Sequence, residues 1–103
     1  MLKVTVLIGL VATAAAAGDL TPGRTSELER LVRQDCGACH GITLKGGLGP
    51  DIRSSALAGS TPETISTIIL DGVPGTAMPP WRPLISEEDA AWIAEYLLKG
   101  TAQ

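Results

Sequence analysis

Apolar residues recur at helical spacing in three segments of the chain, and no segment shows the alternation of a β-strand. The first segment begins at Ser26, whose hydroxyl suits a helix cap, and Glu29 three residues later completes a capping-box pattern. One face of this segment carries Leu28, Leu31 and Val32. The pattern predicts a helix from Ser26 to about Asp35, preceded by a flexible lead-in over residues 18–25.

The second segment begins at Thr61, a favoured N-cap residue, and Pro62 stands at the first helical position. Its predicted buried face consists of Ile65, Ile68 and Ile69. Asp71-Gly72 predicts the end of this helix. Between the first two helices, glycine-rich residues 41–49 predict a loop, and residues 48–57 are expected to contain one short helix.

The third segment has the clearest boundaries. Ser86 and Asp89 form a capping pattern with Asp in place of Glu, three acidic residues occupy the first turn, and Lys99-Gly100 marks the end. Its apolar face carries Trp92, Ile93, Tyr96 and Leu97. Without a strand-like run, a repeat or a linker, the sequence predicts one small all-α domain over residues 26–100.

Five consecutive residues, Cys36-Gly37-Ala38-Cys39-His40, hold both cysteines and the single histidine of the chain. This spacing is the attachment signature of a c-type haem, because two thiols must reach the vinyl groups of one porphyrin edge. The residue after the second cysteine then places an imidazole beneath the iron. The motif predicts covalent haem on Cys36 and Cys39, with His40 as an axial ligand.

Three other interpretations of this motif are weaker. A thioredoxin-like redox pair needs a βαβ context, and no strand-like pattern precedes Cys36. A structural zinc site normally needs four Cys or His ligands, and the chain holds three. A structural disulfide is compatible with export, but it does not explain the adjacent His40.

Residues 1–17 have the features of a cleaved secretory signal peptide. Lys3 and the α-amino group give a positive start, an apolar run follows, and small residues precede a cleavage site between Ala17 and Gly18. The apolar run is short for a membrane span, although an uncleaved N-terminal anchor is the alternative. Both cases place the Cys-x-x-Cys-His motif outside the cytoplasm, and we expect a periplasmic protein without stable membrane insertion after cleavage.

Composition adds two constraints. The chain has 103 residues, no Phe, two Trp and one Tyr, so an 86-residue mature domain has little aromatic filler, and a buried porphyrin would supply an apolar centre. Its net charge of −3 becomes −4 when Lys3 is removed. Because no Lys/Arg cluster is present to neutralise phosphates, the sequence argues against a nucleic-acid partner.

A second candidate iron ligand, Met78, lies between the last two predicted helices. It is the only methionine apart from the initiator. Its loop contains Pro74, Pro79, Pro80 and Pro83, each of which fixes φ and removes conformational freedom. A weak neutral thioether binds iron well only when it is held in place, and His/Met is a recognised cytochrome ligand pair. The alternative is that Met78 fills a gap in the core.

The order of these features resembles class I cytochrome c over about Glu27 to Lys99. By that resemblance, Gly49-Pro50 matches the Gly-Pro pair whose proline carbonyl accepts a hydrogen bond from Nδ1–H of the ligand histidine, which orients the imidazole. Tyr96 matches the aromatic residue that packs the last helix on the first. The chain departs from the family at Leu28, where many members have a glycine at the helix crossing. Candidate haem-propionate partners are Arg53, Trp81 and Arg82.

A narrower resemblance covers residues 33–41, 44–50 and 71–81, which are similar to the NirC family of small periplasmic cytochromes. That family is associated with cytochrome cd-type nitrite reductase of denitrifying bacteria. The resemblance implies electron donation to the reductase or, alternatively, a role in maturation of its haem d.

These features predict a monomeric one-electron carrier with one haem c, rather than an enzyme. His40 and Met78 would occupy both axial positions, and redox partners would dock briefly near an exposed haem edge. We expect Leu44, Leu48, Ala77 and Trp81 to line that docking patch. The competing hypothesis is a haem sensor or enzyme in which Met78 dissociates, although the chain offers no second histidine for acid–base catalysis.

Overall fold

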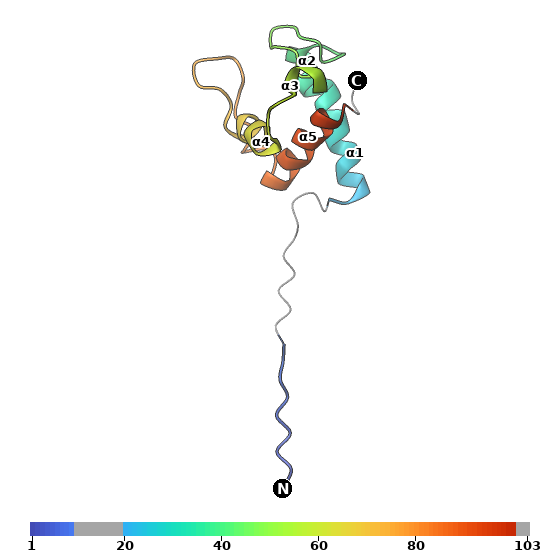
Figure 1. Cartoon of the computed structure of the whole chain (residues 1–103), viewed down its shortest axis with the longest axis vertical. Helices are drawn as coiled ribbons and strands as arrows, with labels where there is room; N and C mark the ends of the chain where they lie inside the picture. Colours follow the sequence, from blue (N-terminus) through green and yellow to red (C-terminus); the bar gives the residue numbers. More distant parts are fainter. Residues whose placement is uncertain (10–19, 101–103) are drawn as a thin grey trace.

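A computed structural model describes residues 1–9 and 20–100, and these residues form helices and loops without a β-strand. The helical elements in chain order are α1 (Pro22–Leu31), the π-helical turn η1 (Val32–Cys36), α2 (Gly37–His40), α3 (Ser54–Leu57), α4 (Pro62–Asp71) and α5 (Glu87–Lys99). Helix α5 contacts α1, α3 and α4, and it lies between α1 and α4 (Figure 1). The prediction of an all-α domain is confirmed.

The first residues of the chain take no part in the helical fold. Residues 1–9 are exposed and contain no helix, and the predicted cleavage site after Ala17 lies outside the described residues. Among the helices that the structure describes, none has both the length and the apolar character required to cross a membrane.

Helix α1 begins earlier than the sequence pattern predicts. Its N-cap is Thr21, whose side-chain oxygen accepts a hydrogen bond from the Arg24 N–H at 3.2 Å, and Pro22 occupies the first helical position. Ser26 and Glu29 lie inside the helix, so the predicted capping box and the flexible state of Pro22–Thr25 are wrong. The reason is that a Thr-Pro pair is a cap signal in itself, and it precedes the Ser26 signal.

The helix that starts at Pro22 does not stop at Asp35. It continues through η1, where the N–H of Gly37 donates to the carbonyl of Val32 five residues back, and then through α2 to His40. A π-helical turn holds more residues per turn than an α-helix and is frequently found at functional sites. The continuous helical path attaches the Cys36–His40 motif rigidly to α1.

The hydrophobic core forms where α5 meets the other helices. Ile93 and Ala90 of α5 are fully buried, as are Leu28 of α1 and Val32 of η1. Core residues packed together are Leu28, Val32, Leu44, Leu70, Ile85, Ala90, Ile93 and Leu97. The crossing of α1 and α5 therefore accommodates a leucine at the position where many class I cytochromes have glycine.

Helix α4 turns a different face to the core than predicted. Ile65 and Leu70 are buried and Ile69 is partly buried, whereas Ile68 remains 43% exposed. At about 100° per residue, Ile65, Ile69 and Leu70 span one side of the helix, and Ile68 lies outside that arc. Ile68 instead borders a hollow of about 300 Å³ whose other lining residues are Glu63, Thr64 and Thr67.

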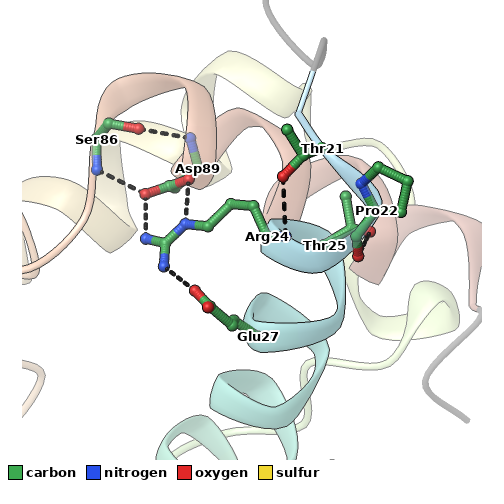
Figure 2. A network of polar contacts seen from close by, with 7 residues as sticks. All are labelled: Thr21, Pro22, Arg24, Thr25, Glu27, Ser86 and Asp89. Carbon is green, nitrogen blue, oxygen red and sulfur yellow. Dashed lines mark hydrogen bonds and ion pairs between the residues drawn. The ribbon is translucent and has the colours of Figure 1, made fainter.

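The predicted capping box of α5 is present and is extended by an ion pair to α1 (Figure 2). The N–H of Ser86 donates to Asp89 Oδ2, and the N–H of Asp89 donates to Ser86 Oγ, both at 3.0 Å. Arg24 of α1 donates from Nε to Asp89 Oδ1 at 3.0 Å and from Nη2 to Oδ2 at 2.6 Å. Its Nη1 donates to Glu27 at 2.8 Å. The starts of the first and last long helices are thus joined through one buried carboxylate.

This network makes stability depend on acid. The hydrogen bonds from Arg24, followed by those from Ser86, hold the pKa of Asp89 below its ordinary range near 3.9. A lowered folded-state pKa contributes stability above about pH 4, and this contribution is lost as pH falls below that value through the folded pKa. We expect the melting temperature of Asp89→Asn to fall less than that of the wild type between about pH 5 and pH 2. An equal fall in both proteins would contradict the prediction.

Candidate haem attachment site

The Cys-x-x-Cys-His motif occupies the junction of η1 and α2. Cys36 is partly buried at the end of η1, Cys39 is exposed in α2, and the two thiols are not bonded to each other. Burial, reinforced by the charge of Asp35, raises the pKa of Cys36 to about 11. The first cysteine of a redox-active pair normally has a lowered pKa. The environment of Cys36 therefore argues against the thioredoxin-like alternative.

The zinc alternative also finds no support in the geometry. Within residues 1–9 and 20–100, no three or more His, Cys, Asp or Glu side chains converge in a way that could hold a metal ion. Cys36, Cys39 and His40 are all among these residues. They lie in one helical stretch without forming a common chelating centre.

The imidazole of His40 is fixed in one tautomer by a backbone carbonyl. Its Nδ1–H donates to the oxygen of Pro50 at 2.8 Å, the bond that the resemblance to class I cytochrome c implies. Because a carbonyl oxygen only accepts, Nδ1 carries a proton, and Nε2 is the ring nitrogen that is left to face a metal. A neutral imidazole with Nε2 available is the form that binds a metal, and such a hydrogen bond sets the ring orientation.

The loop that carries Pro50 folds back onto the end of α2. Gly46 N–H donates to the His40 carbonyl and Gly49 N–H donates to the Cys39 carbonyl, both at 2.8 Å. These bonds satisfy carbonyls that a helix end would otherwise leave without partners. The glycine-rich loop predicted over residues 41–49 is therefore present, and its role is to cap the motif helix.

Gly49 lies directly against the imidazole ring. A Cβ atom built on Gly49 would stand 2.7 Å from both Cε1 and Nδ1 of His40, closer than real Cβ contacts. Only a residue without a side chain allows this approach while the His40–Pro50 bond is kept. The loop thus holds the ring from its face and from its edge.

Of the four residues predicted to line a docking patch, one is not at the surface. Leu44 is 1% exposed and packs in the core cluster. Its backbone is left-handed, with φ 60°. Leu48 is 93% exposed as expected, Ala77 is exposed and Trp81 is partly buried. Ile42, which sequence reasoning missed, is 89% exposed two residues after His40. An isolated apolar residue in a polar loop gave no periodic signal by which to find it.

Met78 lies on a second loop, between α4 and α5. In the view of Figure 1 this loop arches above α4 at the upper left, and the loop after α2 lies at the top. The Met78 side chain is partly buried, and its carbonyl accepts from the N–H of Val73 at 3.3 Å. Gly72 has φ 67°, and a Cβ there would stand 2.7 Å from the Met78 carbonyl oxygen. Glycine is therefore required where the loop leaves α4.

Two of the three candidate propionate partners have carboxylate partners within the chain. Arg53 pairs with Asp51, with Nη2 donating to Oδ2 at 2.8 Å. Arg82 pairs with Asp71 and with Glu87. The third candidate, Trp81, packs against the core cluster.

These groups suit a c-type haem chemically. Two unpaired thiols lie three residues apart on a helical turn, an adjacent imidazole is oriented through Nδ1, and a separate closed loop carries a thioether. Soft sulfur and borderline nitrogen donors are those that haem iron accepts in cytochromes.

Comparison with known proteins agrees with this chemistry. The family described as subunit III of cbb3-type cytochrome c oxidase matches residues 23–97. Cytochrome c55X of Paracoccus denitrificans is 56% identical over 99 residues, which cover 96% of each chain. The solved structure of the c-type cytochrome NirC is 42% identical, with a TM-score of 0.78 over 81% of this chain and 98% of that chain.

A larger protein also contains a related segment. The dihydro-heme d1 dehydrogenase of Pseudomonas aeruginosa is 33% identical over 90 residues, which cover 87% of this chain and 17% of that protein. The family match, over residues 23–97, falls on the helices and loops described above. The chain therefore belongs to the c-type cytochrome family of the cbb3-oxidase subunit III type, as a NirC-like small cytochrome with covalently bound haem c.

Proposed function

We propose that the chain is a one-electron carrier in which Cys36 and Cys39 hold the haem and His40 and Met78 are the axial ligands. The observation that carries this proposal is the 2.8 Å bond from His40 Nδ1–H to Pro50, which orients the ring and leaves Nε2 as the nitrogen for the iron. When bound, the haem iron supplies the one-electron couple. The protein supplies two ligands that need not change between oxidation states.

The role of Met78 rests on the closure of its loop. Gly72 permits a tight exit from α4, and the Val73–Met78 backbone bond shortens the loop. Thr76 Oγ1 donates to the Val73 carbonyl at 2.7 Å and can also accept from the Met78 N–H at 3.3 Å. A loop ordered in advance lowers the entropy lost when a weak donor binds.

The chain provides little for substrate chemistry. His40 is the only histidine, and its two ring nitrogens are accounted for by Pro50 and the proposed iron bond. No other imidazole is available to move a proton near the iron. This arrangement favours electron transfer over a peroxidase-like reaction.

We infer that the cytochrome acts in the periplasm and donates electrons to a cytochrome cd-type nitrite reductase. Its similarity to NirC and to cytochrome c55X of a denitrifying bacterium supports the partner. The positive start, the apolar run and the small residues before Gly18 support export.

The test is the variant Met78→Ala. The oxidised wild-type protein should show the weak sulfur-to-iron charge-transfer band at the red end of the visible spectrum, and the variant should lose it. Its reduction potential should fall, because the thioether stabilises the ferrous state relative to stronger or harder donors. Absorption spectroscopy and a redox titration check both outcomes. An unchanged band would exclude Met78 as a ligand.

A second function is favoured by the relationship to dihydro-heme d1 dehydrogenase. The chain is similar to one segment of this enzyme, whose name describes oxidation of a dihydro-haem. Removal of two hydrogens releases two electrons and two protons. A monohaem cytochrome accepts one electron at a time, so two oxidised molecules would be reduced, and the protons would pass to solvent. The chain would then serve maturation of haem d as an electron acceptor.

The same Met78→Ala variant distinguishes these functions when it is returned to a strain that lacks the cytochrome. If the carrier donates to the finished reductase, cells should assemble haem d and yet reduce nitrite slowly. If the carrier serves maturation, they should accumulate dihydro-haem. Normal assembly together with normal nitrite reduction would count against both functions.

A further inference from the structure

We propose that Arg82 is a positioning residue that closes the base of the Met78 loop and thereby holds the methionine sulfur on the iron. This inference rests on the proposed role of Met78 as an axial ligand. In this role Arg82 binds Asp71 and Glu87, whereas the sequence also made it a candidate partner of a haem propionate. The distinction matters because the two roles predict different responses when Asp71 is changed.

The guanidinium of Arg82 joins the two helices that flank the loop. Its Nε donates to Asp71 Oδ1 at 2.9 Å and its Nη2 donates to Oδ2 at 3.1 Å. Its Nη1 donates to Glu87 Oε1 at 3.2 Å. Asp71 is the last residue of α4 and Glu87 is the first residue of α5. The bidentate pair with Asp71 and the single contact with Glu87 together connect the two ends of the intervening loop.

The backbone reinforces this closure. The N–H of Trp81 donates to the Ile69 carbonyl at 3.1 Å, and the N–H of Arg82 donates to the Leu70 carbonyl at 3.0 Å. These acceptors belong to the last turn of α4, whose carbonyls have no partner inside the helix. The returning chain thus caps α4 through its backbone, and the Arg82 side chain locks it there.

A displacement at this base would reach Met78 directly. Gly72 follows Asp71, and its backbone lies so close to the Met78 carbonyl that no Cβ would fit between them. Val73 then bonds to the same carbonyl. These close contacts connect the base of the loop directly to Met78. Loss of the Arg82–Asp71 pair therefore increases the conformational freedom of the Met78 thioether.

The size of the effect follows from the exposure of the pair. The Arg82 and Asp71 side chains are 49% and 51% exposed, so their attraction is screened by water and salt. Bidentate geometry and the third partner, Glu87, place it at the stronger end of surface pairs. Because a thioether is a weak donor, even a small gain in loop freedom changes its competition with an added ligand.

The experiment measures displacement of Met78 by imidazole in the oxidised haem-containing protein. In Asp71→Asn we expect the imidazole association constant to rise about two- to fivefold at low salt, the range of an exposed pair. The rise should shrink at high salt. The control is Asp51→Asn, which removes the same charge from the bidentate Arg53–Asp51 pair in the loop between α2 and α3. This variant should leave the imidazole association constant unchanged.

A double-mutant cycle separates the two roles of Arg82. If Arg82 acts through Asp71, Arg82→Gln should have little further effect in the Asp71→Asn protein. Amide hydrogen exchange at Trp81 and Arg82 should accelerate by a similar factor in both single variants, whether or not imidazole is present. A full additional effect of Arg82→Gln would overturn the clamp in favour of a direct contact with the haem.

Failure of the clamp and failure of the proposed ligand give different results. If Met78→Ala binds imidazole much more tightly than the wild type while Asp71→Asn and Asp51→Asn match it, Met78 is the ligand and the clamp is wrong. If Met78→Ala and the wild type bind imidazole equally, Met78 is not the displaced ligand. In that case both the clamp and the axial role of Met78 are overturned.

Discussion

Replacement of Gly49 by alanine should displace the His40 imidazole and remove it as a well-oriented ligand. The added Cβ would stand 2.7 Å from Cε1 and Nδ1, and the ring can yield only by breaking its bond to Pro50. Loss of such an orienting bond typically costs about 10–100-fold in metal affinity. The reduced protein should acquire a five-coordinate high-spin fraction, measurable by absorption and resonance Raman spectroscopy.

The matched control is Gly23→Ala. A Cβ on Gly23, in the first turn of α1, meets no atom within 4 Å. Alanine there should leave the haem spectrum unchanged and stabilise the helix by up to about 1 kcal/mol. Neither glycine has a positive φ, so backbone strain does not enter the comparison. If Gly49→Ala keeps the wild-type spectrum, Gly49 does not constrain the ring.

Replacement of Arg24 by methionine should cost about 2–4 kcal/mol in the free energy of unfolding, measured by denaturant titration. Methionine keeps the aliphatic packing of Arg24 but leaves the Asp89 carboxylate, 6% exposed, without its cation. An uncompensated buried charge is strongly destabilising, and partial exposure of Arg24 places the cost below that of a fully buried pair. The pKa of Asp89 should rise because its largest stabilising contact is gone.

Arg53→Met provides the comparison. The Arg53–Asp51 pair has the same bidentate chemistry, but its side chains are 34% and 29% exposed and two residues apart in sequence. Its removal should cost clearly less than removal of the Arg24–Asp89 pair, because water screens the attraction between partly exposed charges. Equal costs for Arg24→Met and Arg53→Met would show that burial of Asp89 and its link between helices contribute nothing.

Helix ends were predictable where one cap signal stood alone. Thr61-Pro62 and Ser86 with Asp89 start α4 and α5 as expected, because their side chains bond to nearby backbone. The predicted start of α1 at Ser26 was wrong because Thr21 and Ser26 both have side chains that can cap a helix. Local pattern alone does not decide between two such signals on one helix.

The candidate site also has parts that were predictable from the sequence and parts that were not. Cys36, Cys39 and His40 are adjacent in sequence, and the Pro50 contact was implied by the family resemblance. The orientation of α4, which exposes Ile68, depends on packing against α5 and was not predictable from periodicity. The pairing of Arg82 with Asp71 and Glu87 likewise requires two helix ends to meet, which no local pattern encodes.

The π-helical turn between α1 and the cysteine motif constrains the spacing of residues in related sequences. One residue added to or removed from a helix rotates everything beyond it by about 100° about the axis. The number of residues between Leu28 and Cys36 therefore determines the direction in which the two thiols point about the helix axis. That direction is set relative to the face of α1 that Leu28 packs into the core. A relative with a regular α-helix in place of Val32–Cys36 would need a different residue count between its core leucine and its first cysteine.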